Sequence, residues 1–479
     1  MSRIESYSRA QFTRQSKVET FIDTFVTLSF CLKPLSVKNS SRRVGKRTEG
    51  DESGRGPRTD FTRDYDRIIF SSAFRRLQDK TQVFPLAKSD YVRTRLTHSL
   101  EVASVRRSLG MLCADVINIH ESTGLKEFSE HDIGSVVAAA CLMHDIGNPA
   151  FGHAGESAIQ EWFEQTALVD KSRLSPEQTT DLLKFEGNAQ GFRMLVNLQN
   201  PNQRGGLQLT SAVLGAFGKY PRSSVVEDSQ TQGVSGKKFG YMQGEAELLN
   251  ELVDELGLVK KAGTGTAWYR HPVAFLMEAA DDICYNIMDV EDGYKAGLIT
   301  FDQLRDVHLP WISRERLARA ETFGQKQRQA EYFRAITINQ LIHASIAVFD
   351  TNYDGLMTGN FDKELTSEIE NADAFKKFKA IARTDVYPSR PVVEIEACGF
   401  EVTAGLLNAF VSASEIHASG QVSGRHKART ALQLLPGGST TIDGKDLYQR
   451  ILVMTDFVSG MTDSYAVQLY PRIRGIAPP

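Results

Sequence analysis

No run of apolar residues in this sequence is long enough to predict a membrane-spanning helix. The apolar run near the N-terminus covers 21–35 (FIDTFVTLSFCLKPL) and is interrupted by Asp23 and Lys33. It is shorter than the roughly 20 residues that a spanning helix needs. No small-residue cleavage site follows it, so a secretory signal is not predicted either. We therefore expect a cytoplasmic protein without a membrane partner.

Cysteine is scarce, and neither charge sign is in large excess. Five cysteines occur among 479 residues, and no two have the CxxC spacing. Most lie in apolar helical stretches, which predicts buried reduced thiols in a reducing compartment rather than disulfides. With 56 Lys and Arg against 59 Asp and Glu, the formal net charge is −3. No general affinity for nucleic acid is indicated, so an anionic ligand would need a local basic pocket.

Glycine-rich phosphate-binding loops are absent as well. The sequence has neither a Walker loop nor a GxGxxG motif after a strand, so phosphate groups would be bound by side chains and a metal ion. Arg can bind two phosphate oxygens at once, whereas Lys acts as a point charge. Spacing alone does not choose among the candidate cations, which are Arg75, Arg76, Lys80, Arg93, Arg95, Lys219, Lys237 and Lys238.

Helical periodicity dominates the rest of the sequence. Residues 36–60 are polar, charged and rich in Gly and Ser, which predicts a flexible linker. Beyond it, apolar residues recur at helical spacing over most of the chain, including 181–198, 245–257 and 272–297. One strand-like piece is expected at Val392–Val402 (VVEIEACGFEV). The predicted fold class is therefore mainly α with a minor β element.

The strongest candidate for chemistry is the His144-Asp145 pair in HDIGNPAFGHAGE. A capping-box pattern, Ser129-Glu130-His131-Asp132, predicts the start of a helix before this pair. The pair is expected in the last turn of that helix, where exposed carbonyl groups favour a nearby cation. His98 alone would be an ordinary histidine, but together with the pair and the distant Asp281 it supplies two imidazoles and two carboxylates. That ligand set suits one divalent cation such as Mn, Fe, Mg or Zn.

Two further groups have both a functional and an ordinary interpretation. Asp281, Tyr285 and Asp289 stand at i, i+4 and i+8, so one helix face could hold a metal ion at one end and a sugar hydroxyl at the other. The same spacing fits an exposed acidic face. His153 could transfer a proton while Glu156 orients its ring, or it could be a loop histidine without a role.

The sequence resembles the HD-superfamily deoxynucleoside triphosphate triphosphohydrolases, in the bacterial deoxyguanosinetriphosphatase branch. The resemblance extends from about residue 58 to the C-terminus. It rests on the motifs FTRDYDRIIFSSAFRRLQDKTQVFPL, RTRLTHSLEVASV, CLMHDIGNPAFGHAGE, FEGNAQGFRML, LGAFGKYP, KFGYMQGE, HPVAFLMEAADDICYNIMDVEDG, VVEIEACGFEV and DFVSGMTDSYA. It implies an N-terminal extension and linker (1–57), a helical HD phosphohydrolase core (58–300) and a helical C-terminal region that completes the core (301–479).

The resemblance also implies roles for individual residues. The metal ligands would be His98, His144, Asp145 and Asp281. Asp281 is preferred over Asp282 because the family pattern is Asp-xxx-Tyr-xxx-Asp. His153 and Glu156 would form the catalytic pair, and Asn148 stands where related enzymes have a second histidine. The implied substrate-binding residues are Gln78, Arg95, Lys219, Tyr220, Lys238, Tyr285 and Asp289.

The implied reaction is metal-dependent hydrolysis of a deoxynucleoside triphosphate, with dGTP preferred, to deoxynucleoside and inorganic triphosphate. A homo-oligomer, commonly a hexamer, and a nucleotide or single-stranded DNA effector are implied partners. Two alternatives remain at this stage. One is an HD phosphodiesterase that acts on a signalling nucleotide, and the other is a nucleic-acid or nucleotide sensor without turnover.

Overall fold

A computed structural model of the chain describes residues 58–84, 93–120 and 129–476. Residues 1–57 of the predicted N-terminal extension and linker, including Cys31, lie outside the described residues. At the end of the predicted linker, Thr59 caps a helix that begins at Asp60. The described residues form α-helices joined by short 3₁₀ and π segments, so the predicted mainly α class is confirmed. Among them, β pairing is limited to three isolated bridges, Thr81 with Thr94, Arg222 with Ala267 and Lys260 with Trp268.

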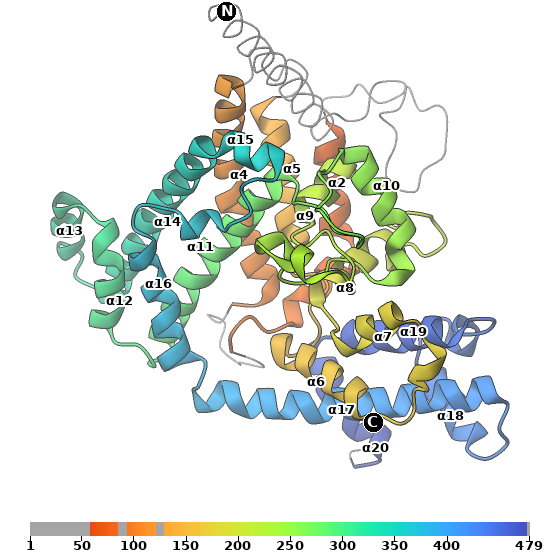
Figure 1. Cartoon of the computed structure of the whole chain (residues 1–479). Coiled ribbons are helices and arrows are strands. Elements are labelled where there is room, and N and C mark those ends of the chain that lie inside the picture. The colour runs from red at the N-terminus through yellow and green to blue at the C-terminus, as the bar shows by residue number, and fades with distance from the viewer. Residues whose placement is uncertain (1–57, 85–92, 121–128, 477–479) are drawn as a thin grey trace, which may run out of the picture.

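The larger of two hydrophobic cores is built around α4, α5 and α11, which contact one another near the centre of Figure 1. The α-helices that contribute to this core are α2 (Asp60–Phe70), α3 (Ser72–Arg76), α4 (Arg95–His120), α5 (Glu130–Met143), α8 (Gly187–Arg193), α9 (Ser211–Phe217), α10 (Ala246–Leu256), α11 (Pro272–Lys295), α12 (Phe301–His308), α13 (Arg314–Glu321), α14 (Lys326–Thr351), α15 (Tyr353–Thr358) and α16 (Ala372–Ile381).

The second core lies beneath the first in Figure 1, where the long helix α17 runs along the lower edge and contacts α6 and α18. Its helices are α6 (Gly152–Gln165), α7 (Pro176–Leu183), α17 (Arg390–Ser419), α18 (Arg425–Leu432), α19 (Leu447–Ser459) and α20 (Asp463–Arg474). Helix α6 follows the HD motif directly, so the chain passes from the first core to the second just after His144-Asp145.

Short helical segments make up most of the remaining regular structure. The 3₁₀ segments are η1 (Leu77–Asp79), η2 (Lys171–Arg173), η4 (Asp228–Thr231), η5 (Val234–Gly236), η6 (Gln243–Glu245), η7 (Leu309–Trp311), η8 (Leu365–Ser367) and η10 (Gly438–Thr441). The π segments are η3 (Met194–Leu198) and η9 (Ala382–Val386).

The strand predicted at Val392–Val402 is wrong, because these residues form the beginning of α17. The alternating Val, Ile and Ala residues suggested a period of two. The residues that are buried are Val392, Gly399, Val402 and Leu406, whose spacings of 7, 3 and 4 belong to one helix face. Pro391 at the start of the helix is also compatible with helical backbone.

Helix α5 carries the HD pair to its position. A capping box formed by Ser129 and Asp132 starts the helix, as the sequence predicted. Its residues from Val136 to Met143 are all buried, so the helix is enclosed on every side. Helix α4 approaches it closely, since a Cβ atom added at Gly110 would lie 2.8 Å from the Cα atom of Gly134. This approach brings the two helices that carry His98 and His144 together.

The structure also addresses the expectations about membranes and thiols. Within the described ranges, no helix combines the length and the apolar character needed to cross a bilayer. The four described cysteines, Cys113, Cys141, Cys284 and Cys398, are free thiols, as predicted.

Candidate metal centre and its surroundings

The side chains predicted as metal ligands come from three helices and converge. His98 lies in the first turn of α4, His144 caps the end of α5, and Asp281 lies on α11. Oδ1 of Asp281 is 3.3 Å from Nε2 of His98 and 3.3 Å from Nε2 of His144. Ligand atoms of His98, His144 and Asp145 all lie within 4.8 Å of one another. Atoms bound to one cation at about 2.1 Å have separations of this order.

The hydrogen bonding of His144 shows which of its nitrogens could bind a cation. Nδ1 lies 2.6 Å from the carbonyl oxygen of Cys141. A carbonyl only accepts hydrogen bonds, so Nδ1 carries the hydrogen and the neutral ring has its lone pair on Nε2. Nε2 is buried and has no hydrogen-bond partner among the described residues. Its lone pair faces carboxylate oxygens of Asp281 and Asp145, at 3.3 Å and 3.5 Å.

A lone pair that faces two carboxylates is favourable only if a positive charge lies between them. Burial alone would lower the pKa of His144, but Asp145 and Asp281 outweigh it, and the pKa is raised. The site therefore stabilises a positive charge at this point. A ligating histidine commonly donates its other N–H group to a backbone carbonyl, as His144 does to Cys141. The residues fit a divalent cation.

The two carboxylates of the group are ionised. Burial would raise the pKa of Asp145, but the Arg95 guanidinium, followed by His144 and His98, lowers it to about 2. Arg95 Nη1 is 2.8 Å from Asp145 Oδ2. The Asp281 side chain is 20% exposed. Burial would raise its pKa, but the Lys219 ammonium and His144 hold the pKa well below the usual range. Both carboxylates can therefore bind a cation at neutral pH without losing a proton.

The turn after the HD pair is fixed against helix α8. Nδ2 of Asn148 donates a 2.5 Å hydrogen bond to Asp145 Oδ1, which orients that carboxylate. A Cβ atom added at Gly147 would lie 2.1 Å from both the Gly187 oxygen and the Gly191 nitrogen. Only glycine allows this approach, which explains why the HDIGN motif and the FEGNAQGF motif occur together.

The predicted catalytic pair is preformed. Nδ1 of His153 lies 3.2 Å from Glu156 Oε2, and Glu156 Oε1 accepts a 2.6 Å hydrogen bond from the Gly187 amide. Glu156 is buried, which would raise its pKa, but the hydrogen bond from His153 and the charge of Lys238 lower it. The His153 side chain is 80% exposed. Its outer nitrogen is therefore open to solvent while the inner one is held by a carboxylate.

The predicted triphosphate residues are paired with acidic groups in this structure. Lys219 Nζ lies 2.7 Å from Asp281 Oδ2, next to the metal group. Lys238 Nζ lies 2.8 Å from a carboxylate oxygen of Glu186, at the start of α8. The Tyr220 ring lies under the guanidinium of Arg270, 5.4 Å from ring centre to Cζ. The charge of each of the two lysines is therefore offset by a carboxylate in this structure.

Tyr285 and Asp289 extend the same face of α11, as predicted, and they join a residue that the sequence did not reveal. The hydroxyl of Tyr387 lies 2.9 Å from the Tyr285 hydroxyl and 2.5 Å from Asp289 Oδ2. Tyr387 follows the π segment η9, about a hundred residues along the chain, and no spacing or motif indicated it. Asp289 is 1% exposed. Burial raises its pKa to about 8, and the Tyr387 hydrogen bond only partly offsets this.

Gln78 is not brought into the group by any hydrogen bond or ion pair between described residues. It lies in η1 and its side chain is exposed. Its predicted place near phosphate and sugar stays a prediction.

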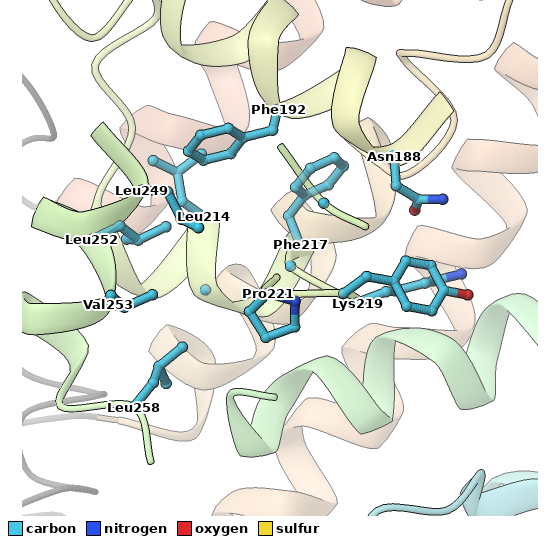
Figure 2. A pocket seen from close by; sticks show the side chains of 14 residues that line it. Asn188, Phe192, Leu214, Phe217, Lys219, Pro221, Leu249, Leu252, Val253 and Leu258 are labelled. Atoms are coloured by element: carbon cyan, nitrogen blue, oxygen red, sulfur yellow. The ribbon is translucent and has the colours of Figure 1, made fainter. Parts of the chain in front are cut away.

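A small apolar cavity backs the loop that carries Lys219 (Figure 2). Its volume is about 20 Å³, which is room for roughly one water molecule. Leu249, Leu252 and Leu258 line one end, and Asn188 and Lys219 lie at the other. None of the proposed metal ligands lines this cavity. It is too small for a nucleotide, so the metal group remains the candidate site.

The chain has sequence relatives among known proteins. No model of a protein family matches the chain. A protein of Synechocystis sp. is 40% identical over 446 residues, which cover 91% of this chain and 98% of the relative. A protein of Pseudomonas aeruginosa is 37% identical over 91% of this chain and 98% of its own length. A protein of Listeria monocytogenes is 34% identical over 88% and 95%. All three are named deoxyguanosinetriphosphate triphosphohydrolase-like proteins.

Proposed function

This chain belongs to the deoxyguanosinetriphosphate triphosphohydrolase-like family, and we propose that it hydrolyses deoxynucleoside triphosphates, with dGTP preferred, to deoxynucleoside and inorganic triphosphate. One observation carries the proposal. The buried Nε2 of His144 faces Asp281 and Asp145, beside His98, and this arrangement favours a positive charge between them. A divalent ion bound by these residues would supply that charge.

His98, His144, Asp145 and Asp281 would hold one divalent ion. Mixed imidazole and carboxylate ligands suit Mn, Mg, Fe or Zn, so the ligand set leaves the ion's identity open. When bound, such an ion supplies Lewis acidity toward a phosphate oxygen and lowers the pKa of water.

The protein's own side chains would bind the charged part of the substrate and move the proton. Lys219, Lys238 and Arg95, each paired with a carboxylate in this structure, would offset the charge of the triphosphate. Water adds to the α-phosphorus while the bond from this phosphorus to the 5′-oxygen breaks, which yields the complete triphosphate and a deoxynucleoside. Nε2 of His153, whose ring Glu156 orients, either protonates the departing 5′-oxygen or accepts a proton from the attacking water.

Tyr285, Asp289 and Tyr387 would bind the sugar. Their hydroxyl and carboxyl groups form one hydrogen-bonded cluster, and the raised pKa of Asp289 makes this end of the face uncharged. An uncharged polar cluster suits a sugar hydroxyl rather than a phosphate. As the family resemblance implies, a sugar ring placed against the Tyr285 face would leave no space for a 2′-hydroxyl group, which would favour deoxyribose.

The wider setting is part of the same proposal. We expect the enzyme to control deoxynucleotide pools in the cytoplasm, where free thiols such as those of the described cysteines persist. We also expect a homo-oligomer, with a hexamer as the first state to test. A nucleotide or single-stranded DNA would be the regulatory ligand.

The experiment is a substrate panel with the purified protein. Four deoxynucleoside triphosphates and GTP are supplied singly and in mixtures, with Mg or Mn, and both products are identified. Deoxynucleoside and inorganic triphosphate in equal amounts support the proposal. Release of orthophosphate or pyrophosphate, or turnover only of guanosine tetraphosphate or a cyclic dinucleotide, contradicts it. Oligonucleotide binding without metal-dependent turnover would indicate a sensor.

A pair of histidine variants on α4 provides the matched control. His98→Asn removes a proposed ligand at the start of the helix. His120→Asn changes a partly exposed histidine at its other end, which is paired with Asp350. Loss of turnover in the first variant and not in the second supports the assigned site.

A further inference from the structure

The motif DFVSGMTDSYA near the C-terminus has no part in the site described so far. It covers the end of α19, a short turn and the start of α20, and we refer to residues 456–464 as the 456–464 segment. The segment belongs to the second core, whereas the metal group belongs to the helices of the first. One of its side chains, that of Asp463, nevertheless bonds to the turn that follows the HD pair.

Asp463 binds the backbone of that turn. It is 1% exposed, and its Oδ1 accepts a 2.9 Å hydrogen bond from the Phe151 amide. Its Oδ2 accepts one of 2.9 Å from the Thr81 amide and another from the Thr81 hydroxyl. A buried carboxylate is costly unless its oxygens are hydrogen-bonded, and these three donors meet that need. One side chain thus joins the turn to the loop after η1.

Lys80 binds the other end of the same turn. It is 3% exposed, and its ammonium donates to the Asn148 oxygen at 2.5 Å and to the Ser459 oxygen at 3.1 Å. Burial and the nearby Arg76 lower its pKa to about 7, which shows how unfavourable this position is for a charge. A buried lysine that donates to two backbone carbonyls connects the turn to the 456–464 segment at a second point.

Asp456 holds the helix on which the turn packs. Its two oxygens accept hydrogen bonds from Arg193, between 2.8 and 3.1 Å, and one of them accepts a 2.9 Å bond from Gln190. Both donors lie on α8, the helix that contacts Gly147. The 456–464 segment therefore contacts the turn directly through Asp463. It is also connected to the turn by Lys80, which donates to both, and by α8.

The turn itself separates the two chemical groups of the site. Asp145 lies just before it and His153 just after it. Phe151 has φ of 63°, a left-handed conformation that a non-glycine residue adopts only when its surroundings impose it. The Asp463 bond to the Phe151 amide is one of those surroundings. Phe151 is the N-cap of α6, so its backbone conformation sets the direction in which the helix leaves the turn. The directions of His153 and Glu156, in the first turns of α6, follow from it.

We propose that Asp463, with Lys80 and Asp456, positions the 146–151 turn so that His153 lies correctly relative to the metal ligands. These are positioning residues and not catalytic ones, and the inference rests on the proposed function. If these residues only docked α19 and α20 onto the rest of the protein, hydrogen bonds between side chains would be sufficient. Asp463 and Lys80 instead bind main-chain atoms of one short turn, the Phe151 N–H and the Asn148 carbonyl, which fixes the path of the backbone.

The test variant is Asp463→Asn, which keeps the shape but replaces one acceptor oxygen with a donor. Misplacement of a catalytic group by about 1 Å typically costs about 100-fold in rate. We expect kcat with dGTP to fall between about 10- and 100-fold, with KM and bound metal unchanged. The control is Asp443→Asn, since Asp443 is an exposed aspartate of the same region that pairs with His417. An unchanged kcat in Asp463→Asn overturns the proposal.

Hydrogen–deuterium exchange separates this proposal from the proposed function, because it needs no turnover. Peptides that contain Phe151 should exchange faster in Asp463→Asn than in the wild type, while peptides of α14 should not. Uniformly faster exchange, with a matching loss of Tm, would mean a purely structural role and overturns the proposal. If the wild type hydrolyses no deoxynucleotide, the proposed function fails, and the exchange at Phe151 alone decides whether Asp463 positions the turn.

A second pair of variants covers the case in which Asp463→Asn does not fold. Thr81→Val removes the hydroxyl that donates to Asp463, and Thr81→Ser keeps it. A lower kcat and faster exchange at Phe151 in the valine variant, with near-normal values in the serine variant, support the proposal. Equal behaviour of the two variants contradicts it.

Discussion

Asp281 and Asp289 are the same residue type on the same face of α11, two helical turns apart, yet their charges differ. The Asp281 side chain is 20% exposed, and Asp289 is 1% exposed. The pKa of Asp281 lies well below its usual range because Lys219 and His144 outweigh its burial. The pKa of Asp289 is raised to about 8 by burial, with only the Tyr387 hydroxyl and more distant cations opposing it. The cations beside Asp281 and the deeper burial of Asp289 together decide which of the two carboxyl groups is ionised.

This difference divides the helix face into two functional ends. The ionised end, with two imidazoles and two carboxylates, attracts a cation. The neutral end offers hydroxyl and carboxyl groups to an uncharged partner. A nucleotide has both kinds of group, a charged phosphate chain and an uncharged sugar. The variants below test whether the two ends act separately.

The largest expected effect comes from Asp281→Asn compared with Asp289→Asn. The first variant removes a proposed ligand and leaves Lys219 without its partner, whereas the second replaces a group that is already neutral. We expect metal affinity to fall by more than the 10- to 100-fold typical of residues that only support ligands, with turnover undetectable. Asp289→Asn should keep its metal. Metal analysis after gel filtration measures this, and equal metal content in both variants would refute the division.

His153→Gln should give the next largest effect. Loss of a proton-transfer group typically lowers the rate by about 100- to 10,000-fold, and His153 makes no contact with the metal ligands among the described hydrogen bonds. We expect kcat to fall within that range while the metal stays bound. His426→Gln, at another exposed histidine, is the control. Near-wild-type kcat in His153→Gln would show that the catalytic assignment is wrong.

Asp289→Ala should have a smaller effect that is confined to the sugar end. Removing the carboxyl group leaves the Tyr387 hydroxyl without its acceptor, so KM for dGTP should rise. Leaving a buried polar group without its partner costs about 1–3 kcal/mol, or roughly 5- to 160-fold. Discrimination between dGTP and GTP, measured as the ratio of kcat/KM values, should weaken. An unchanged ratio would contradict the assignment of the sugar to this cluster.

A separate prediction concerns stability and pH rather than activity. An unfolded aspartate ionises near pH 4, whereas folded Asp289 stays protonated to about pH 8, so between these values the folded state binds the extra proton. The contribution of Asp289 to the free energy of unfolding therefore falls by up to about 1.4 kcal/mol per pH unit as the pH rises through this window, and is constant outside it. Asp289→Asn cannot ionise, so its Tm relative to wild type should increase from about pH 5 to about pH 8. A difference that does not vary with pH would mean that Asp289 is ionised in the folded protein.

Much of the fold could be predicted because its signals are local. The capping box at Ser129 and the helical spacing along 272–297 depend on residues within a few turns of one another, and both are confirmed. The strand predicted at Val392–Val402 was wrong for the same reason. A short window of alternating apolar residues could not reveal the much longer helical stripe that buries one face of α17.

The sequence by itself determined which residue types could bind a cation and which face of α11 they share, because helix geometry converts spacing into direction. Only the tertiary structure decided the rest. It placed Tyr387 against Asp289, aligned the His144 lone pair with Asp281, and brought Asp463 to the Phe151 amide from more than 300 positions along the chain. These contacts depend on how separate helices pack, and helix packing joins residues whose distance along the chain carries no signal of their proximity.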